Sequence, residues 1–346
     1  MYIIGTVGPR VKELNALKGI IDNGANALRF NFAHGSDNEF LEFLQMAKEI
    51  KNDIKIILDI SGTKIRISNK FKYIYKVYDG EEIIFCGEDI YEKLRVILNN
   101  SRIKIIPLNI KNSILYSNNY NLITIKDNTM IFEVIEKNNN AIKVKVLKGG
   151  IVRKGKGCNI KDLDRSVLSL SKEDKRAMLW GIKNNVDIIC QSFVENKQDV
   201  ESIKSFIGKH KENDTNVKIW AKIETLNGVN NIDKIIEEAD GIVIGRGDLI
   251  PETSIEDTPM YEDKIISEVS KKKDKDLIIA THIFNSMKVG KMPYLSEVES
   301  IYNFMRNGVT GFLLAGETSV GKAPVKTVKF LKNLIYKYEN TMKKEK

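Results

Sequence analysis

The sequence is poor in the residues that form disulfide frameworks and soft-metal sites. Cys86, Cys158 and Cys190 lie far apart and form no CxxC pair, which argues against both disulfide pairing and a thiolate zinc site. The three histidines show no metal-binding spacing such as HExxH. We therefore expect neither a disulfide scaffold nor a metal centre built on cysteine or histidine.

Long hydrophobic runs are also missing. No stretch of about 18 apolar residues occurs, and the chain does not open with a charged and then apolar leader. A membrane span requires such a stretch and a secretory signal requires such a leader, so we expect neither. The expected location is the cytoplasm.

The net charge is +9, but most basic residues are interspersed with acidic ones. Only KKKDK, at residues 271–275, is a true cluster of lysines. Nucleic-acid-binding proteins gather basic residues on one face, so we expect no nucleic-acid partner. A lysine-rich solvated surface, which also attracts anionic metabolites, is the simpler interpretation.

The sequence does contain eight short apolar segments, each ending in polar residues and followed by a helical pattern. The apolar segments occupy residues 2–8, 27–35, 54–62, 186–193, 217–224, 241–248, 277–283 and 311–318. The helical patterns occupy residues 12–24, 39–52, 172–185, 197–210, 228–239, 261–273, 295–308 and 324–338. Near-continuous apolar runs are typical of parallel strands buried on both faces, and eight βα units predict an α/β fold, a (β/α)8 TIM barrel. The carboxyl ends of its strands meet at one mouth, where we expect the chemistry.

Between residues 66 and 155 the pattern changes to short alternating segments separated by Asp-Gly, Asn and Gly turns. This pattern predicts a small antiparallel β domain, a β-barrel lid inserted after the third strand. Its 90 residues leave 256 of the 346 for the barrel, at 1–65 and 156–346, close to the ~250 of a TIM barrel. A β domain hinged at the mouth can act as a lid.

Charged residues end the fifth and sixth segments, at Lys222, Glu224 and Asp248. Alternation along a strand puts Lys222 and Glu224 on one side, and adjacent strands bring Asp248 near Glu224. Two carboxylates beside a lysine suit a hard divalent cation, and the lysine can meet charge on a transferred group. The alternative is that these residues form surface ion pairs.

Other segment ends carry further candidates. The second segment offers Arg29, Asn31 and His34, and the third offers Asp59. Arginine suits a phosphate because its planar fork makes paired hydrogen bonds, whereas Asn31 and Asp59 can supply oxygens to a metal.

The last two segments add Thr281 and Glu317, and residues 316–323 read GETSVGKA. This string is close to the phosphate-binding GxxxxGK[ST] loop, but Ala323 replaces the hydroxyl that would hold Mg²⁺. The surrounding alternation of strand and helix patterns is that of a barrel, not of an open nucleotide-binding sheet. We therefore prefer the barrel interpretation.

Taken in order, the segments resemble the pyruvate kinase family over almost the whole chain. The resembling strings are TVGP, ALRFNFAHG, LDISGTKIR, KGKGCN, LSLSKED, VDIICQSF, KIWAKIE, ADGIVIGRGDL, ATHIFNSM and LAGETSVGKAP. The resemblance implies a barrel with an inserted β lid. It also implies phosphoryl transfer from phosphoenolpyruvate to ADP, giving pyruvate and ATP.

The resemblance further implies roles for single residues. Glu224 and Asp248 would hold Mg²⁺ or Mn²⁺, and Lys222 would stabilise the moving phosphoryl group and the enolate. Arg29 would contact the phosphate, and Thr281 would lie beside the carbon that is protonated. The substrate carboxylate would bind the backbone of Gly245, Arg246, Gly247 and Asp248. The nucleotide would bind His34, Arg66 and Lys156, with Asp127 as a lid contact.

The chain departs from the family at the site of the monovalent cation, usually K⁺. Asn31 and Asp59 remain, but Ala33 and Ile60 stand where the family has Ser and Thr. Lys64 stands where many members have Glu, and its compact charge can replace the cation. We therefore expect a weakened cation site and activity without K⁺.

Departures also occur beside the substrate and at the end of the chain. Ile250 and Pro251 follow the carboxylate turn where the family has Gly and Val or Ile, and His282 replaces a common Gln. Pro251 removes an amide donor, so the turn and the substrate can differ. Because the chain stops at Lys346, we expect no C-terminal effector domain, and a monomer or a dimer through the barrel helices.

Three functions remain open at this point. A phosphotransferase of the pyruvate kinase type is preferred, because its five catalytic and metal-binding groups are all present. A related enzyme acting on another enolpyruvyl or 2-oxo acid outside glycolysis is the second, supported by the residues that follow the carboxylate turn. The third is a non-catalytic binding or regulatory homologue, which the intact set of groups disfavours.

Overall fold

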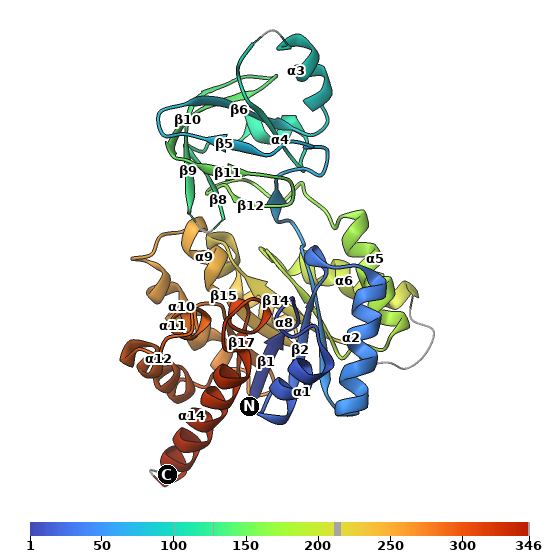
Figure 1. Ribbon diagram of the computed structural model, residues 1–346, viewed down its shortest axis with the longest axis vertical. Coiled ribbons are helices and arrows are strands. Elements are labelled where there is room, and N and C mark those ends of the chain that lie inside the picture. Colours follow the sequence, from blue (N-terminus) through green and yellow to red (C-terminus); the bar gives the residue numbers. More distant parts are fainter. Residues whose placement is uncertain (100, 127, 211–215, 345–346) are drawn as a thin grey trace. The chain divides into compact units, whose positions relative to one another are not determined.

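The computed structural model describes residues 1–99, 101–126, 128–210 and 216–344, which fold as two compact units (Figure 1). The barrel unit comprises Met1–Gly62, Leu170–Leu249 and Glu256–Lys346, and the inserted unit comprises Thr63–Ser169 and Ile250–Ile255. The inserted unit is longer than the predicted insertion of residues 66–155. One reason is that Ile160 and Leu163 are buried in its hydrophobic core.

The eight apolar segments form the strands of the barrel unit, which confirms the TIM barrel. These strands are β1 (Tyr2–Thr6), β2 (Ala27–Asn31), β3 (Lys55–Ile60), β13 (Ile188–Gln191), β14 (Lys218–Ile223), β15 (Gly241–Gly245), β16 (Asp276–Ala280) and β17 (Gly311–Leu314). They close in the order β1-β17-β16-β15-β14-β13-β3-β2. Neighbouring strands are parallel, and parallel strands covered on both faces need apolar residues at nearly every position.

Side chains inside the barrel form an apolar plug. It comprises Ile4, Ala27, Ile57, Ile188, Cys190, Trp220, Val243, Ile278, Ala280 and Leu313. Because side chains alternate between the two faces of a strand, the residue two positions beyond an interior residue also faces inward. In three strands that next residue is charged, namely Arg29, Asp59 and Lys222. The sequence thus stacks charged side chains on an apolar plug at the carboxyl end of the barrel.

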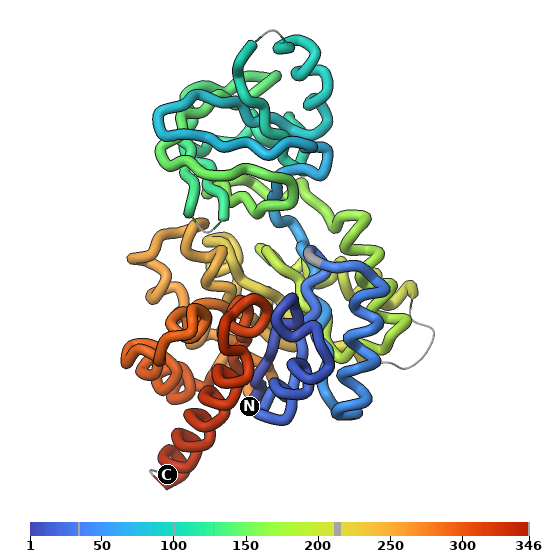
Figure 2. Tube along the Cα trace, in the orientation of Figure 1, coloured from blue at the N-terminus to red at the C-terminus, as the bar shows by residue number. Residues whose placement is uncertain are grey.

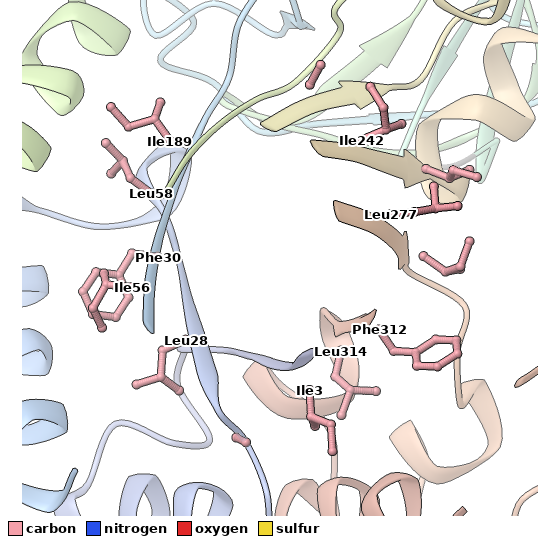
Figure 3. Close-up of a cluster of buried hydrophobic side chains, with 14 of the residues drawn as sticks. Ile3, Leu28, Phe30, Ile56, Leu58, Ile189, Ile242, Leu277, Phe312 and Leu314 are labelled. Carbon is pink, nitrogen blue, oxygen red and sulfur yellow. The ribbon is translucent and has the colours of Figure 1, made fainter. Parts of the chain in front are cut away.

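The outer face of the strands packs against a ring of helices. Figure 3 shows Phe30, Leu58 and Ile242 among the side chains of this cluster that point away from the barrel centre. The covering helices are α1 (Leu14–Asp22), α2 (Asp37–Ile50), α5 (Lys172–Lys183), α6 (Lys197–His210), α7 (Leu226–Asn230), α8 (Ile232–Glu238), α10 (Thr258–Ser270), α12 (Leu295–Arg306) and α14 (Pro324–Lys344).

Local side chains set several helix starts. Ser171 and Asp174 form a capping box at the start of α5, and Pro324 is the first residue of α14, where a missing N–H costs nothing. Figure 2 shows the blue N-terminal segment beside the red C-terminal segment, consistent with the pairing of β1 and β17. Within the described ranges, no helix is both long enough and apolar enough to span a bilayer.

Within the described ranges of the barrel unit, four short helices begin within five residues of a strand end and were not predicted from the sequence. They are η1 (Phe32–His34), α9 (Arg246–Glu252), α11 (Asn285–Lys288) and α13 (Gly316–Ser319). The predicted end of the sixth strand was therefore wrong, because β15 ends at Gly245 and Arg246 begins α9. The backbone leaves the sheet here, where the N–H of Gly247 donates to the hydroxyl of Thr281.

The inserted unit is built around a seven-stranded sheet, which the alternating segments predict. In sheet order its strands are β4 (Ile65–Arg66), β12 (Gly157–Asn159), β8 (Leu122–Ile125), β9 (Met130–Lys137), β10 (Ile142–Lys148), β6 (Glu82–Gly87) and β7 (Ile105–Leu108), and β11 (Gly150–Val152) pairs with β5 (Tyr75–Val77). The sheet is not wholly antiparallel, because β6 and β7 run parallel. A parallel pair requires a crossover, which contains α3 (Tyr91–Ile97). Neither α3 nor α4 (Asn112–Ser117) was predicted.

A buried ion pair fixes residues 250–255 within the inserted unit. Arg165 NH2 lies 2.7 Å from Glu252 Oε1, and the two side chains are 3% and 2% exposed. Asn159 Nδ2 donates to the same oxygen at 3.1 Å. Helix α9 therefore begins in the barrel unit, at a strand end, and finishes in the inserted unit.

Candidate active site

Four polar side chains lie on the apolar plug of the barrel. Asp59 Oδ2 accepts hydrogen bonds from Lys222 Nζ at 2.5 Å and from Arg29 Nε at 2.6 Å. Ser192 Oγ donates to Asp59 Oδ1 at 3.1 Å and accepts from Lys222 Nζ at 2.9 Å. Each residue stands at the end of a different strand, so the barrel brings together three of the predicted site residues.

The charges in this cluster stabilise one another. Burial alone would raise the pKa of Asp59, but Arg29 and Lys222 outweigh burial and lower this pKa to about 2. Burial alone would lower the pKa of Lys222, but the nearby negative charge of Asp59 has the opposite effect, and the pKa of Lys222 is raised. Both groups are therefore charged at neutral pH. Two cations around one anion leave this cluster with a net positive charge.

Glu224, a predicted metal ligand, directly follows β14 and is 5% exposed. Its Oε2 accepts a hydrogen bond from the N–H of Phe193 at 3.0 Å. Its other oxygen lies against Gly245 on the neighbouring strand, since a Cβ built there would lie 2.7 Å from Oε1. Glycine at this position therefore leaves room for the carboxylate.

Asp248, the second predicted metal ligand, is the third residue of α9, which follows the strand next to that of Glu224. Mg²⁺ usually binds one or two protein carboxylates and completes its shell with water and phosphate oxygens. Two carboxylates on neighbouring strand ends fit that pattern. Among the described residues, no group of three or more His, Cys, Asp or Glu side chains could form a metal cage from protein alone.

Thr281 follows β16 in a left-handed backbone conformation, with φ of +67° at Thr281 and +52° at His282. This conformation is rare for a β-branched residue. Thr281 Oγ1 accepts from the N–H of Gly247 at 2.8 Å and donates to the carbonyl of Ala280 at 2.5 Å. The structure thus joins Thr281 to the predicted carboxylate-binding turn.

The residues predicted for the monovalent cation already have protein partners. Asn31 Oδ1 accepts from the N–H of Ala33 at 3.2 Å and caps η1. Both oxygens of Asp59 accept hydrogen bonds from the polar cluster. Lys64 belongs to the inserted unit, where a Cβ built at Gly157 would lie 2.8 Å from its Cε.

The residues predicted for the nucleotide are distributed over both units. His34 is the last residue of η1 in the barrel unit. Arg66 and Lys156 belong to the inserted unit, where Arg66 NH1 donates to the carbonyl of Gly155 at 3.1 Å. Burial and two neighbouring basic side chains lower the pKa of Lys156, as in a region of concentrated positive charge. Asp127 lies outside the described residues.

Two polar residues of the site, Ser192 and Thr6, were missed by the sequence analysis. Thr6 Oγ1 accepts a hydrogen bond from Arg29 NH1 at 3.3 Å. Each stands two positions beyond a residue of the apolar plug, Ile4 for Thr6 and Cys190 for Ser192. Counting the alternation outward from the plug could have found both.

The segment that resembles a phosphate loop, residues 316–323, has another role. Its first residues form α13, and Glu317 is 2% exposed. Glu317 Oε1 accepts from the N–H groups of Ile283 and Phe284 at 3.1 and 3.2 Å. A buried carboxylate here would repel a phosphate, and the surrounding sheet is a closed barrel.

The chain is similar to known proteins over most of its length. The family described as "Pyruvate kinase, barrel domain" matches residues 1–328. Pyruvate kinase of Thermotoga maritima is 30% identical over 344 residues, which cover 98% of this chain and 71% of that protein. Pyruvate kinase 1 of Saccharomyces cerevisiae is 31% identical over 94% of this chain and 65% of its own length. Pyruvate kinase of Geobacillus stearothermophilus is 28% identical over 98% of this chain and 57% of its own length.

Proposed function

Because this chain belongs to the pyruvate kinase family, we propose that it transfers the phosphoryl group of phosphoenolpyruvate to ADP, giving pyruvate and ATP. The observation that carries the proposal is the contact of Arg29 and Lys222 with the buried carboxylate of Asp59 at the carboxyl end of the barrel. Such an arrangement suits an anionic substrate with a phosphate to transfer.

Phosphoryl transfer depends mainly on positioning and on neutralising charge. Asp59 fixes both cations before any substrate binds, so little reorganisation is needed during the reaction. Arg29 is proposed to bind the phosphate through its planar guanidinium. Lys222 is proposed to stabilise the transferring group and the enolate that remains.

Glu224 and Asp248 are proposed to hold Mg²⁺ or Mn²⁺. When bound, the ion would neutralise charge on the phosphate oxygens. The N–H of Phe193 orients the Glu224 carboxylate, and Gly245 lacks the Cβ that would displace it. The protein thus contributes two ligands and leaves the remaining positions to water and substrate.

Thr281 is proposed to lie beside the carbon that takes a proton when enolpyruvate becomes pyruvate. The backbone from Gly245 to Asp248 is proposed to bind the substrate carboxylate through N–H groups other than that of Gly247, which already donates to Thr281. In the inserted unit, Arg66 and Lys156 are proposed to bind the nucleotide. This unit is proposed to act as a lid that excludes water during transfer.

The test is an assay of the purified protein with phosphoenolpyruvate, ADP and Mg²⁺, in which pyruvate and ATP are both measured. We expect equal amounts of the two products, and no product when either substrate is omitted or EDTA is added. Binding of phosphoenolpyruvate and metal without turnover would contradict the proposal and identify a non-catalytic homologue.

A second candidate is a reaction on another enolpyruvyl or 2-oxo acid. It is favoured by Pro251, which lies inside α9 and removes an amide donor close to the proposed carboxylate turn. Comparing kcat/KM across a series of such acids separates the two candidates. A value higher than that for phosphoenolpyruvate would favour the second.

We also propose that transfer does not require K⁺. Ala33 and Ile60 replace hydroxyl residues of the family's cation site, and Asn31 is engaged in capping η1. The ammonium group of Lys64 is proposed to supply the positive charge in place of K⁺. Initial rates in tetramethylammonium buffer, with and without added KCl, should be equal, and a strict K⁺ requirement would reject the proposal.

A further inference from the structure

The turn that follows β16, residues 281–284, is bound at its carbonyl groups by a single arginine. Arg246 NH2 donates to the carbonyls of Thr281 and His282, at 2.7 Å each, and Arg246 Nε donates to the Thr281 carbonyl at 3.1 Å. Arg246 stands at the start of α9, so the arginine and the turn belong to neighbouring strand ends.

The amide groups of the same turn are bound by a carboxylate. Glu317 Oε1 accepts from the N–H groups of Ile283 and Phe284, and Glu317 belongs to α13, beyond the next strand of the barrel. A cation therefore holds the carbonyls of one half of the turn, and an anion holds the N–H groups of the other half. Both contacts are favourable, because the cation faces carbonyl oxygens and the anion faces N–H groups.

The conformation of the turn explains why such support is needed. Thr281 and His282 have φ of +67° and +52°, and residues in this region persist only where their surroundings hold them. Arg246 is itself braced, since its Nε lies 3.8 Å from Glu262 Oε1 and its guanidinium lies 5.5 Å from the centre of the Phe304 ring. Its side chain is 13% exposed.

We propose that Arg246 and Glu317 are positioning residues, which hold the turn so that the Thr281 hydroxyl stays at its contact with the N–H of Gly247. This inference rests on the proposed function, because it assigns both residues to the reaction step beside Thr281. Arg246 acts on the turn through its side chain, in addition to the substrate contact proposed for its backbone.

The kinetic test uses Arg246→Gln, which removes the charge and the planar fork. A displacement of about 1 Å at a reacting group can cost about 100-fold in rate, so we expect kcat to fall by up to that factor. The KM for phosphoenolpyruvate should change far less, because Arg29 and Lys222 are untouched. Exchange of the methyl protons of pyruvate in D2O should fall at least as much as kcat. Arg246→Lys keeps the charge without the planar fork, so its kcat should lie between those of the wild type and Arg246→Gln.

The structural test measures amide hydrogen exchange at Ile283 and Phe284. We expect Glu317→Ala to speed exchange at both amides several-fold, and Glu317→Gln, which keeps an acceptor oxygen, to have a smaller effect. Arg246→Gln should also speed exchange there. The matched control is Arg176→Gln, which removes an exposed arginine near Asp37 and should change neither kinetics nor exchange.

The outcomes separate the two proposals. Wild-type kcat and wild-type amide exchange in folded Arg246→Gln would overturn the positioning role. An inactive wild-type protein whose amide exchange still responds to Glu317→Ala would overturn the proposed function alone. If circular dichroism shows that Arg246→Gln does not fold, Arg246→Lys and Glu317→Gln carry the same comparison.

Discussion

Lys222 Nζ lies 2.5 Å from Asp59 Oδ2, although the two residues are 163 positions apart in the chain. The contact joins the third strand of the barrel to the fifth and is buried at both ends. It keeps the lysine charged in an apolar setting and aligns it with Arg29. The contact therefore depends on the strand order of the barrel, in which only β13 lies between β3 and β14.

Replacement of Lys222 by methionine tests this relationship. Methionine keeps the apolar stem but removes the charge, so Lys222→Met should lower kcat by roughly 10²–10³-fold. The fold should persist, because Asp59 retains Arg29 and Ser192 as partners. Steady-state rates and circular dichroism provide the measurement.

Lys218→Met is the matched control for this change. Lys218 lies at the other end of β14 and pairs with Asp276 at 2.9 Å, so its loss should leave kcat unchanged. Near-normal turnover in Lys222→Met would overturn the role given to that lysine.

The low pKa of Asp59 predicts a dependence of stability on pH. This pKa is about 2 in the folded protein against an ordinary value of 3.8. Between those values the unfolded chain binds more protons, so the free energy of unfolding should fall by about 2 kcal/mol as the pH drops through this window. Above it the stabilisation is fully present.

Urea unfolding of the wild type and Asp59→Asn measures this contribution. The measurements run from about pH 2 to about pH 5, which spans the titration of this carboxyl group. The variant should show a flatter pH dependence than the wild type. Equal slopes in wild type and Asp59→Asn would contradict the prediction.

A methyl group at Gly245 should disturb the metal site. In Gly245→Ala the new Cβ would lie 2.5 Å from Cγ and 2.7 Å from Oε1 of Glu224, so the carboxylate must move. Changes that reorient a metal ligand typically cost about 10–100-fold in metal affinity, and we expect the Mg²⁺ concentration at half-maximal rate to rise by that factor. In Gly208→Ala the methyl group would meet no atom of the described residues within 4 Å, and the Mg²⁺ dependence should be unchanged. A Gly245→Ala protein with the wild-type Mg²⁺ dependence would refute the assignment.

The ion pair of Arg165 and Glu252 should be important for stability. Arg165→Met takes a cation from beside a buried carboxylate, and the free energy of unfolding should fall by roughly 3 kcal/mol or more. The exposed pair of Lys197 and Glu201, 3.6 Å apart, provides the control, since Lys197→Met should cost below about 0.5 kcal/mol. Similar costs for the two variants, measured by urea unfolding, would show that burial of the first pair has no special effect.

The strands could be predicted because their signal is local. Each apolar strand of the barrel can be recognised from a few consecutive residues, and the polar residue that follows indicates its carboxyl end. Lys222 and Asp59 were therefore both found as candidates. Their pairing was not predicted, since strand adjacency brings together only the ends of neighbouring strands, whereas β13 lies between β3 and β14.

The short helices at the strand ends were missed for a similar reason. Helices of three to seven residues have almost no intrinsic stability, so their sequence pattern is weak. The turn before α11 is fixed by Glu317, more than thirty positions away in the chain. The parallel pairing of β6 and β7 in the inserted unit likewise depends on contacts that an alternating pattern does not specify.

Cys190, which lies in the apolar plug beneath the polar cluster, has a consequence for the protein's chemistry under oxidative stress. Burial raises the pKa of this thiol to about 12, as it does for Cys86 and Cys158. A thiol must ionise to react with peroxide or with an alkylating agent. Catalysis should therefore continue unchanged in the presence of iodoacetamide or mild oxidants.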